Sequence, residues 1–273
     1  MYKKIIISIL IISMMVAIVG CAKSGTKADA NVAESGKLAK IKEKGKLVLG
    51  TAADYPPYEF HKLIDGKDEI VGFDIEIAKK IAADIGVELE IVDMKFEGLL
   101  PALVTDDVDF IIAGMVANEE RKKSVDFSIP YYQGKQKMVV RVEDKDKLKG
   151  PEDFNGLKIG AQKSTIQEEI AAEKFSSAEY IGLSKITDLV LELKNKKIDG
   201  IILAEPVAIA YVAQNKDIYM PEVILGQEDG ISVAVNKGNS DLLELINGTL
   251  DKLLKDGSID KFIQDASALA DEN

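Results

Sequence analysis

Short apolar runs alternate with amphipathic segments along most of the chain. Residues 46–51 have the length and apolar character of a strand. Between residues 73 and 85, phenylalanine or isoleucine recurs at every fourth position, which marks one face of a helix, and Gly86 is a stop signal. A strand, a short helix and a buried strand follow at 87–92, 97–104 and 108–112. This β-α-β-α-β order predicts a mostly parallel sheet covered by helices.

The same pattern recurs in the second half. A strand at 157–161, a helical stripe at 186–193 and a strand at 198–202 follow the order of the first half. The chain is therefore expected to form two α/β lobes, by internal duplication or by convergent patterning. A further strand at 231–235 and two helices, at 240–255 and 258–268, are expected to add to the first lobe.

This organisation predicts the domain boundaries. Lobe 1 is expected to hold residues 45–135 plus 229–273, and lobe 2 residues 136–228. The chain would cross between the lobes near 133–141 and near 226–230. Two crossings make a hinge that permits closure and limits twisting.

The N-terminal segment has the form of a secretory signal. Lys3 and Lys4 precede an uncharged, mostly apolar stretch, so residues 1–20 are expected to be a signal peptide. The segment ends at Cys21 in a pattern that resembles the lipobox of bacterial lipoproteins, which implies that this cysteine carries lipid; the alternative is a chance cysteine beside an ordinary cleavage site. The small, polar residues that follow are expected to form a flexible tether over 21–44.

Composition excludes several classes of function. The formal charge of −11 argues against nucleic acid as a partner. Cys21 is the single cysteine, so no intrachain disulfide can form, and His61 is the single histidine. Zinc sites and Ser-His or Cys-His catalysis are therefore poorly supplied, and neither a metal nor a cofactor is expected.

Five segments carry a more specific resemblance. In chain order they are LVLGTAADYPPYEF, IVGFDIEIAKKIA, FEGLLPALVTDDVDFIIAGM, EERKKSVDFSIPYY and GAQKSTIQEEI. Together they resemble the extracellular amino acid-binding proteins of ATP-driven importers, the polar amino acid family of solute-binding proteins, over residues 45–268. The resemblance implies a two-lobed, type II periplasmic-binding-protein-like α/β fold. It also implies capture of a free L-amino acid, polar or basic, between the lobes.

An arginine just past a buried strand is the central candidate for the site. In open α/β sheets, ligands bind beyond the carboxyl ends of strands, and a guanidinium matches a carboxylate with two parallel hydrogen bonds. The resemblance assigns the ligand α-carboxylate to Arg121, with backbone help from Gly114 and Val116; Val116 departs from the family because it has no hydroxyl. Thr165, at the start of a helix in lobe 2, is expected to add a second carboxylate contact. The alternatives are a surface ion pair for Arg121, a turn role for Gly114 and pure helix capping for Thr165.

Other matched positions surround the rest of the ligand. Glu205 matches a family aspartate that binds the ligand ammonium, and its alternative is a solvent-exposed acid at a helix start. Tyr55 and Phe96 match aromatic residues that sandwich the ligand side chain, although either ring could be plain core. Gln162 matches a position that contacts the side chain in some relatives. Ala52 replaces an acid, so the resemblance leaves polar, uncharged and basic amino acids open.

The resemblance also implies a mechanism without chemistry. The ligand first meets the larger lobe, and closure brings Thr165 and Glu205 onto it. A monomer, held by lipid on Cys21 at the outer face of the cytoplasmic membrane of a Gram-positive cell, would deliver the amino acid to an ABC permease and its ATPase. The alternatives are a dehydratase on the same scaffold or a freestanding amino acid sensor.

Overall fold

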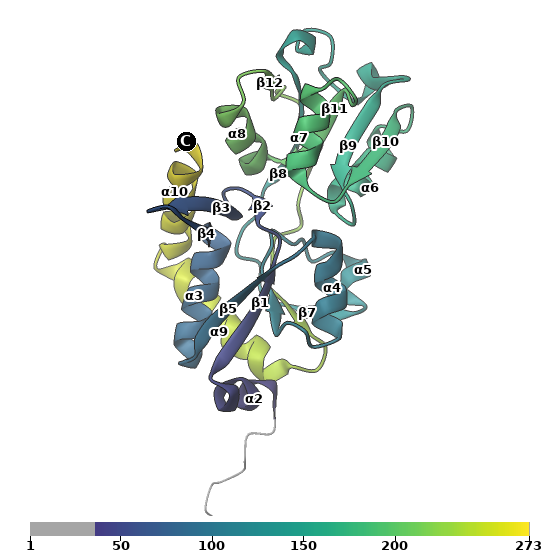
Figure 1. Ribbon diagram of the computed structural model, residues 1–273. Coiled ribbons are helices and arrows are strands. Elements are labelled where there is room, and N and C mark those ends of the chain that lie inside the picture. Colours follow the sequence, from purple (N-terminus) through teal and green to yellow (C-terminus); the bar gives the residue numbers. More distant parts are fainter. Residues whose placement is uncertain (1–35, 273) are drawn as a thin grey trace, which may run out of the picture. The chain divides into compact units, whose positions relative to one another are not determined.

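The computed structural model describes residues 36–272 (Figure 1). The expected signal peptide, the lipidation site Cys21 and the tether up to residue 35 lie outside these residues. Residues 37–44, which we expected to belong to the tether, instead form helix α2 (Lys37–Lys44). Ile41 of this helix is buried in the core, so the folded domain begins earlier than the sequence pattern predicts.

The first sheet is built on three parallel strands. Its strands are β1 (Lys46–Thr51), β5 (Glu88–Asp93), β6 (Phe110–Ile111), β7 (Val125–Phe127) and β14 (Ala234–Asn236). They lie in the order β5-β1-β6-β14-β7, with β14 antiparallel to β6 and β7. The sheet is therefore mostly parallel, as expected, and is mixed only because β14, which returns from the second sheet, runs in the opposite direction.

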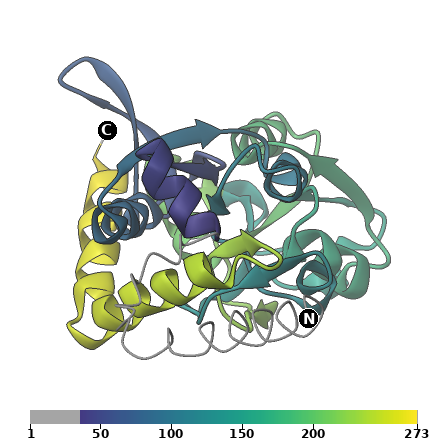
Figure 2. The ribbon, with the colours of Figure 1, turned by 90° about the horizontal axis from the view of Figure 1, so that it is seen from below.

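Helices cover this sheet and extend from it. They are α2, α3 (Phe73–Ile85), α4 (Phe96–Val104), α5 (Glu119–Lys122), α9 (Ser240–Lys255) and α10 (Ser258–Asp271). Helix α3 has the predicted bounds: Phe73, Ile77 and Ile81 are fully buried on its inner face, and Gly86 closes it with a left-handed backbone. Figure 2 shows α3, α9 and α10 packed together along one side.

The second sheet repeats the design. Its strands are β8 (Lys135–Arg141), β9 (Lys158–Gln162), β10 (Glu179–Leu183), β11 (Gly200–Ala204), β12 (Ile218–Tyr219) and β13 (Gly226–Gln227). The order is β10-β9-β11-β8-β12, with β13 also paired to β8. Strands β10, β9 and β11 are parallel, whereas β8 is antiparallel to β11. The helices of this part are α6 (Ile166–Lys174), α7 (Ile186–Lys194) and α8 (Glu205–Gln214).

A small third sheet follows β1 in the chain. It is formed by β2 (Asp54–Tyr55), β3 (Glu59–Ile64) and β4 (Lys67–Val71). We use "lobe 1" for the first sheet with this small sheet and their helices, and "lobe 2" for the second sheet with α6, α7 and α8. The chain passes from lobe 1 to lobe 2 between β7 and β8 and returns between β13 and β14 (Figure 1).

The two lobes are in direct contact, so the structure is a closed form. The Tyr211 hydroxyl of α8 donates to the backbone oxygen of Asp54 at 2.9 Å. The Asp54 carboxylate accepts from the Ile186 amide, the first of α7, at 2.7 Å. Arg121 donates to the Ser164 carbonyl at 2.8 Å. Within residues 36–272 no helix is long and apolar enough to cross a membrane.

Candidate ligand-binding site

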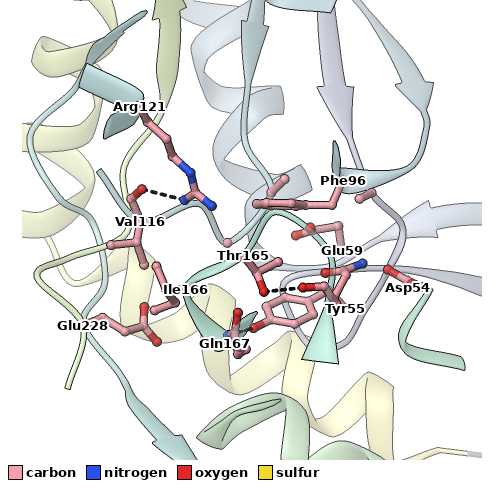
Figure 3. A pocket seen from close by; sticks show the side chains of 14 residues that line it. Asp54, Tyr55, Glu59, Phe96, Val116, Arg121, Thr165, Ile166, Gln167 and Glu228 are labelled. Carbon is pink, nitrogen blue, oxygen red and sulfur yellow. Dashed lines mark hydrogen bonds between the residues drawn. The ribbon is translucent and has the colours of Figure 1, made fainter. Parts of the chain in front are cut away.

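A narrow cavity lies between the lobes. Both lobes contribute to its wall (Figure 3). The lining residues are Ala52, Asp54, Tyr55, Glu59, Phe96, Ala113, Gly114, Val116, Arg121, Gln162, Thr165, Ile166, Gln167 and Glu228. All the predicted ligand-binding residues except Glu205 are in this set.

Arg121 is held at the cavity by a short helix. The Asn118 side chain caps α5 by accepting from the Arg121 amide at 3.0 Å. The guanidinium is buried and donates to the Val116 carbonyl at 2.7 Å (Figure 3). It also lies 5.3 Å from the centre of the Phe96 ring. Burial lowers the pKa of Arg121 to about 10, and Glu169 opposes this shift, so the group stays charged at neutral pH.

Gly114 is required by its backbone and by close packing. Its φ of +54° lies in the left-handed region, and a Cβ atom would come within 2.9 Å of the Tyr55 ring. Its amide donates to Asp74 at 2.9 Å. The glycine therefore lets the aromatic side chain approach the strand exit, and its amide is already paired.

Lobe 2 presents Thr165 and Gln162 to the cavity. Both side chains are buried. Thr165 caps α6 by accepting from the Glu168 amide at 3.4 Å, and its hydroxyl donates to the Gln162 carbonyl at 2.6 Å. The Gln162 amide donates to the Ser184 carbonyl at 3.0 Å. Thr165 thus has the capping role that was its alternative and also lines the cavity.

Two aromatic side chains flank the cavity from lobe 1. Tyr55 and Phe96 are more than nine-tenths buried, with exposed fractions of 9% and 8%. The Tyr55 hydroxyl accepts from the Gln167 side chain of lobe 2 at 3.2 Å. These rings offer apolar faces for the stem of a ligand side chain.

Glu205 does not line the cavity. Strand β11 ends at the buried Ala204, and Glu205 is the first residue of α8, where its side chain turns away from the cavity. Its Oε1 lies 3.6 Å from the Lys137 ammonium, and it lines a separate hollow with Tyr132. Glu205 is therefore the predicted ligand-binding residue that does not line this cavity.

Three other acidic side chains line the cavity: Asp54, Glu59 and Glu228. Glu228 is 3% exposed; its Oε1 accepts from Gln136 at 2.7 Å, and its Oε2 has no partner among the described residues. Burial raises the pKa of Glu228 to about 7. None of the three was among the ligand-binding residues predicted from the sequence. For Glu228 the available signal was its place in the second crossing, just before Gly230.

Glu59 belongs to a buried carboxyl pair. Its neighbour Asp74 accepts from the Gly114 amide and from the Tyr131 hydroxyl, both at 2.9 Å. Burial first, and then Asp74, raise the pKa of Glu59 well above its usual range. Burial also raises the pKa of Asp74, to about 6, although its hydrogen bonds oppose this. Burial and the neighbouring Asp74 therefore both favour the neutral form of Glu59, whereas the hydrogen bonds that Asp74 accepts favour its ionised form.

The described residues 36–272 hold no cluster of three or more His, Cys, Asp or Glu side chains arranged for a metal ion. Two α/β lobes, two crossings and a cavity enclosed by both lobes define a two-lobed binding protein of the type II periplasmic class.

Comparison with known proteins agrees with this class. A profile of bacterial extracellular solute-binding proteins, family 3, matches residues 47–265, and the chain belongs to this family. It is 36% identical over 225 residues to the arginine-binding extracellular protein ArtP of Bacillus subtilis, covering 80% of this chain and 84% of the relative. It is 34% identical over 219 residues to a probable histidine-binding protein of Campylobacter jejuni, covering 80% and 83%.

Solved structures extend the similarity to three dimensions. One is the amino acid ABC transporter substrate-binding protein AbpA from Streptococcus pneumoniae bound to L-arginine. It has a TM-score of 0.83 and 38% identity, and the match covers 86% of this chain and 99% of that one. The predicted fold and family are thereby confirmed, and substrate binding is the function of the chain.

Proposed function

We propose that this protein captures a free basic L-amino acid, arginine first, and delivers it to an ABC permease. The observation that carries the proposal is the buried guanidinium of Arg121 in a cavity that both lobes enclose. Each of its terminal nitrogens carries a second N–H besides the one given to a backbone carbonyl. A ligand carboxylate can accept from these remaining N–H groups, with Thr165 lining the cavity from the opposite lobe.

The charge of the cavity favours a cationic ligand. Burial raises the pKa of Glu59 well above its usual range and so favours its neutral form; once a ligand ammonium has ionised Glu228, the charged groups are Arg121, Asp54 and Glu228. One guanidinium against two carboxylates leaves a net charge of −1. An amino acid with a cationic side chain has a net charge of +1 and balances this, whereas glutamine or cystine does not. Relatives named for arginine and histidine agree with this preference.

The space for a long side chain lies beside the narrow cavity. At Ala52, Asp54 and Phe96 the cavity adjoins a second hollow of about 530 Å³ between the lobes. This hollow has Asp93 in its wall as a further acid. A stem lying between Tyr55 and Phe96 would carry its distal cation towards this acidic side. The small Ala52 leaves that path open.

A ligand panel tests the proposal directly. The domain from residue 36 onwards, purified free of ligand by unfolding and refolding, should bind arginine and lysine measured by calorimetry. Glutamine and cystine should bind at least ~10-fold more weakly, since each leaves a buried carboxylate unpaired. Saturating arginine at ~100 times its dissociation constant should add ~2.7 kcal/mol to the free energy of unfolding. Tighter binding of glutamine than of arginine would overturn the basic specificity, and no binding of any amino acid would overturn the ligand class.

The cellular setting rests on the sequence. We propose a monomeric lipoprotein, cleaved after residue 20 and held by lipid on Cys21 at the outer face of a Gram-positive membrane; labelling with palmitate tests the anchor. The protein binds its ligand without turnover, in contrast to the dehydratase alternative. Recovery of unchanged arginine after prolonged incubation with the protein tests this distinction.

A further inference from the structure

Glu228 is a buried acid, and one of its two carboxylate oxygens makes no hydrogen bond within the described residues. It is 3% exposed and lines the cavity, and its Oε2 has no hydrogen-bond partner among residues 36–272. An unpaired buried carboxylate oxygen is costly, and such groups are rare unless a ligand or a proton satisfies them. The oxygen therefore marks a place where a hydrogen-bond donor of the ligand belongs.

The position of Glu228 matches the ligand α-ammonium. Val116 and Ile231 form an isolated antiparallel bridge, and the Ala117 amide approaches the Gly230 carbonyl at 3.4 Å. The segment that carries Glu228 thus runs beside the strand exit whose Val116 carbonyl binds Arg121. In Figure 3 Glu228 and Val116 lie on the side of the cavity away from Asp54. Because the α-carbon carries both charged groups, the acid for the ammonium must lie at the carboxylate end, as Glu228 does.

Glu228 is also tied to both lobes. Its Oε1 accepts from the Gln136 side chain, whose own Oε1 accepts from Gln167 at 2.8 Å. Gln167, on α6, in turn donates to the Tyr55 hydroxyl of lobe 1 at 3.2 Å. Gln136 lies just after the first crossing and Glu228 within the second. The hydrogen-bond chain therefore joins the two crossings to the cavity wall.

We propose that Glu228 receives the α-ammonium group of the ligand, and that its hydrogen bonds through Gln136 and Gln167 couple this charge to the closed hinge. The proposal rests on the proposed capture of a basic amino acid. It transfers to a hinge residue the role that the sequence assigned to Glu205. Since the ligand ammonium stabilises the ionised carboxylate, binding near neutral pH should expel a proton from Glu228.

The groups that face Glu228 are phenols, and one further acid of the cavity titrates in the same range. The phenols are those of Tyr55, Tyr58 and Tyr132. Burial raises the pKa of Asp54 to about 6, so only the part of the proton release that Glu228→Gln removes is assigned to Glu228. Phenols are neutral below about pH 9, so they do not exchange protons in the relevant range. Lys137, beside Gln136 on β8, directs its ammonium to the Glu222 carbonyl at 3.1 Å and towards Glu205.

Two isosteric variants, one at Glu228 and one at Glu205, test which acid binds the ligand ammonium. Glu228→Gln should weaken arginine binding by ~10–100-fold, and Glu205→Gln by less than ~3-fold. The probe that identifies the group is 5-guanidinopentanoic acid, which is arginine with hydrogen in place of the α-amino group. For this analogue the penalty of Glu228→Gln should shrink to within ~3-fold, because no ammonium is present to lose its partner. A penalty that persists with the analogue would place Glu228 at the distal guanidinium and overturn the proposal.

Proton release from the unaltered protein gives a second test that does not depend on how a variant folds. Calorimetry in buffers of different ionisation enthalpy should show close to one proton released per arginine at about pH 6, falling towards none at about pH 8. The release should be reduced by Glu228→Gln and retained by Glu205→Gln. No release at about pH 6 would overturn the proposal. If arginine binds but both variants behave alike, the inference about Glu228 fails alone; if no basic amino acid binds, the proposed function fails with it.

Discussion

At the scale of single residues, the guanidinium of Arg121 joins backbone carbonyls of both lobes, Val116 at 2.7 Å and Ser164 at 2.8 Å. Arg121→Ala is expected to weaken arginine binding by ~2–5 kcal/mol, because the ligand carboxylate is left buried and unpaired. Arg121→Lys should recover only part of this loss, since an ammonium cannot form two parallel hydrogen bonds with a carboxylate. Calorimetry measures both.

The matched control for Arg121 is its neighbour. Lys122 is exposed and pairs with Glu119 on the surface at 2.8 Å, so Lys122→Ala should leave the affinity unchanged. Thermal unfolding of each variant separates loss of binding from loss of folding. An Arg121→Ala variant that folds and binds as tightly as the parent would exclude Arg121 as the carboxylate clamp.

The residues of the site differ in how far the sequence could predict them. Thr165 follows the end of β9 closely, and Arg121 lies in α5 after the exit from β6; both stand inside recognisable motifs, so local sequence places them at the cavity. Glu205 also follows a strand end. Strand β11 ends at Ala204, and Glu205 is already the first residue of α8, outside the set that lines the cavity. Glu228 reaches the cavity only because its segment runs beside residues 115–117. That contact between distant segments has no local signal.

At the scale of elements, helix α7 is completed from the other lobe. Its N-cap residue Lys185 has no capping side chain, and the Asp54 carboxylate of β2 accepts from the Ile186 amide instead. A helix N-terminus favours an anion, so this contact should stabilise the closed form. Asp54→Asn keeps an acceptor but removes the charge, which is expected to cost ~0.3–1 kcal/mol of closure. Small-angle X-ray scattering of the ligand-free protein should then show a larger radius of gyration.

A control on the same helix isolates the contact between lobes. Asp188 lies in the first turn of α7 and is exposed. Asp188→Asn therefore removes a similar charge from the helix start without touching lobe 1, and its scattering curve should match the parent. Identical curves for Asp54→Asn and the parent would show that Asp54 does not stabilise closure.

A helix with a clear apolar periodicity, α3, was predictable from the sequence, whereas α2, which lacks that periodicity, was not. The stripe from Phe73 to Ile85 predicts α3 because its own apolar residues form the buried face. Helix α2, KLAKIKEK, carries only Leu38 and Ile41 as large apolar residues, so its sequence reads as polar. It is ordered by packing against α9 and β1, which supply the missing apolar surface. Tertiary contacts overrode local pattern there.

At the scale of the whole molecule, buried carboxyl groups link folding to pH. The pKa of Glu228 is about 7 and that of Asp74 about 6 in the folded protein, both raised by burial. Between their ordinary values and these, the folded protein keeps protons that the unfolded chain has released. The free energy of unfolding should therefore fall as pH rises from about 5 to about 8, and level off above. The fall should be on the order of 2 kcal/mol for Glu228 alone, at ~1.36 kcal/mol per pKa unit.

Salt-bridged surface acids do not cancel this fall in the free energy of unfolding with rising pH. Salt-bridged surface groups such as Asp84 and Asp106 have lowered pKa values, so their contribution to stability is lost only in more acidic solution. Urea unfolding at several pH values gives the slope, which Glu228→Gln should reduce and Glu205→Gln should not. Saturating arginine should also flatten it, because Glu228 is then ionised at all these pH values and paired with the ligand ammonium. If the free energy of unfolding had the same pH dependence with and without arginine, the ligand would leave the proton on Glu228. The Glu228 carboxyl would then not pair with the ligand ammonium.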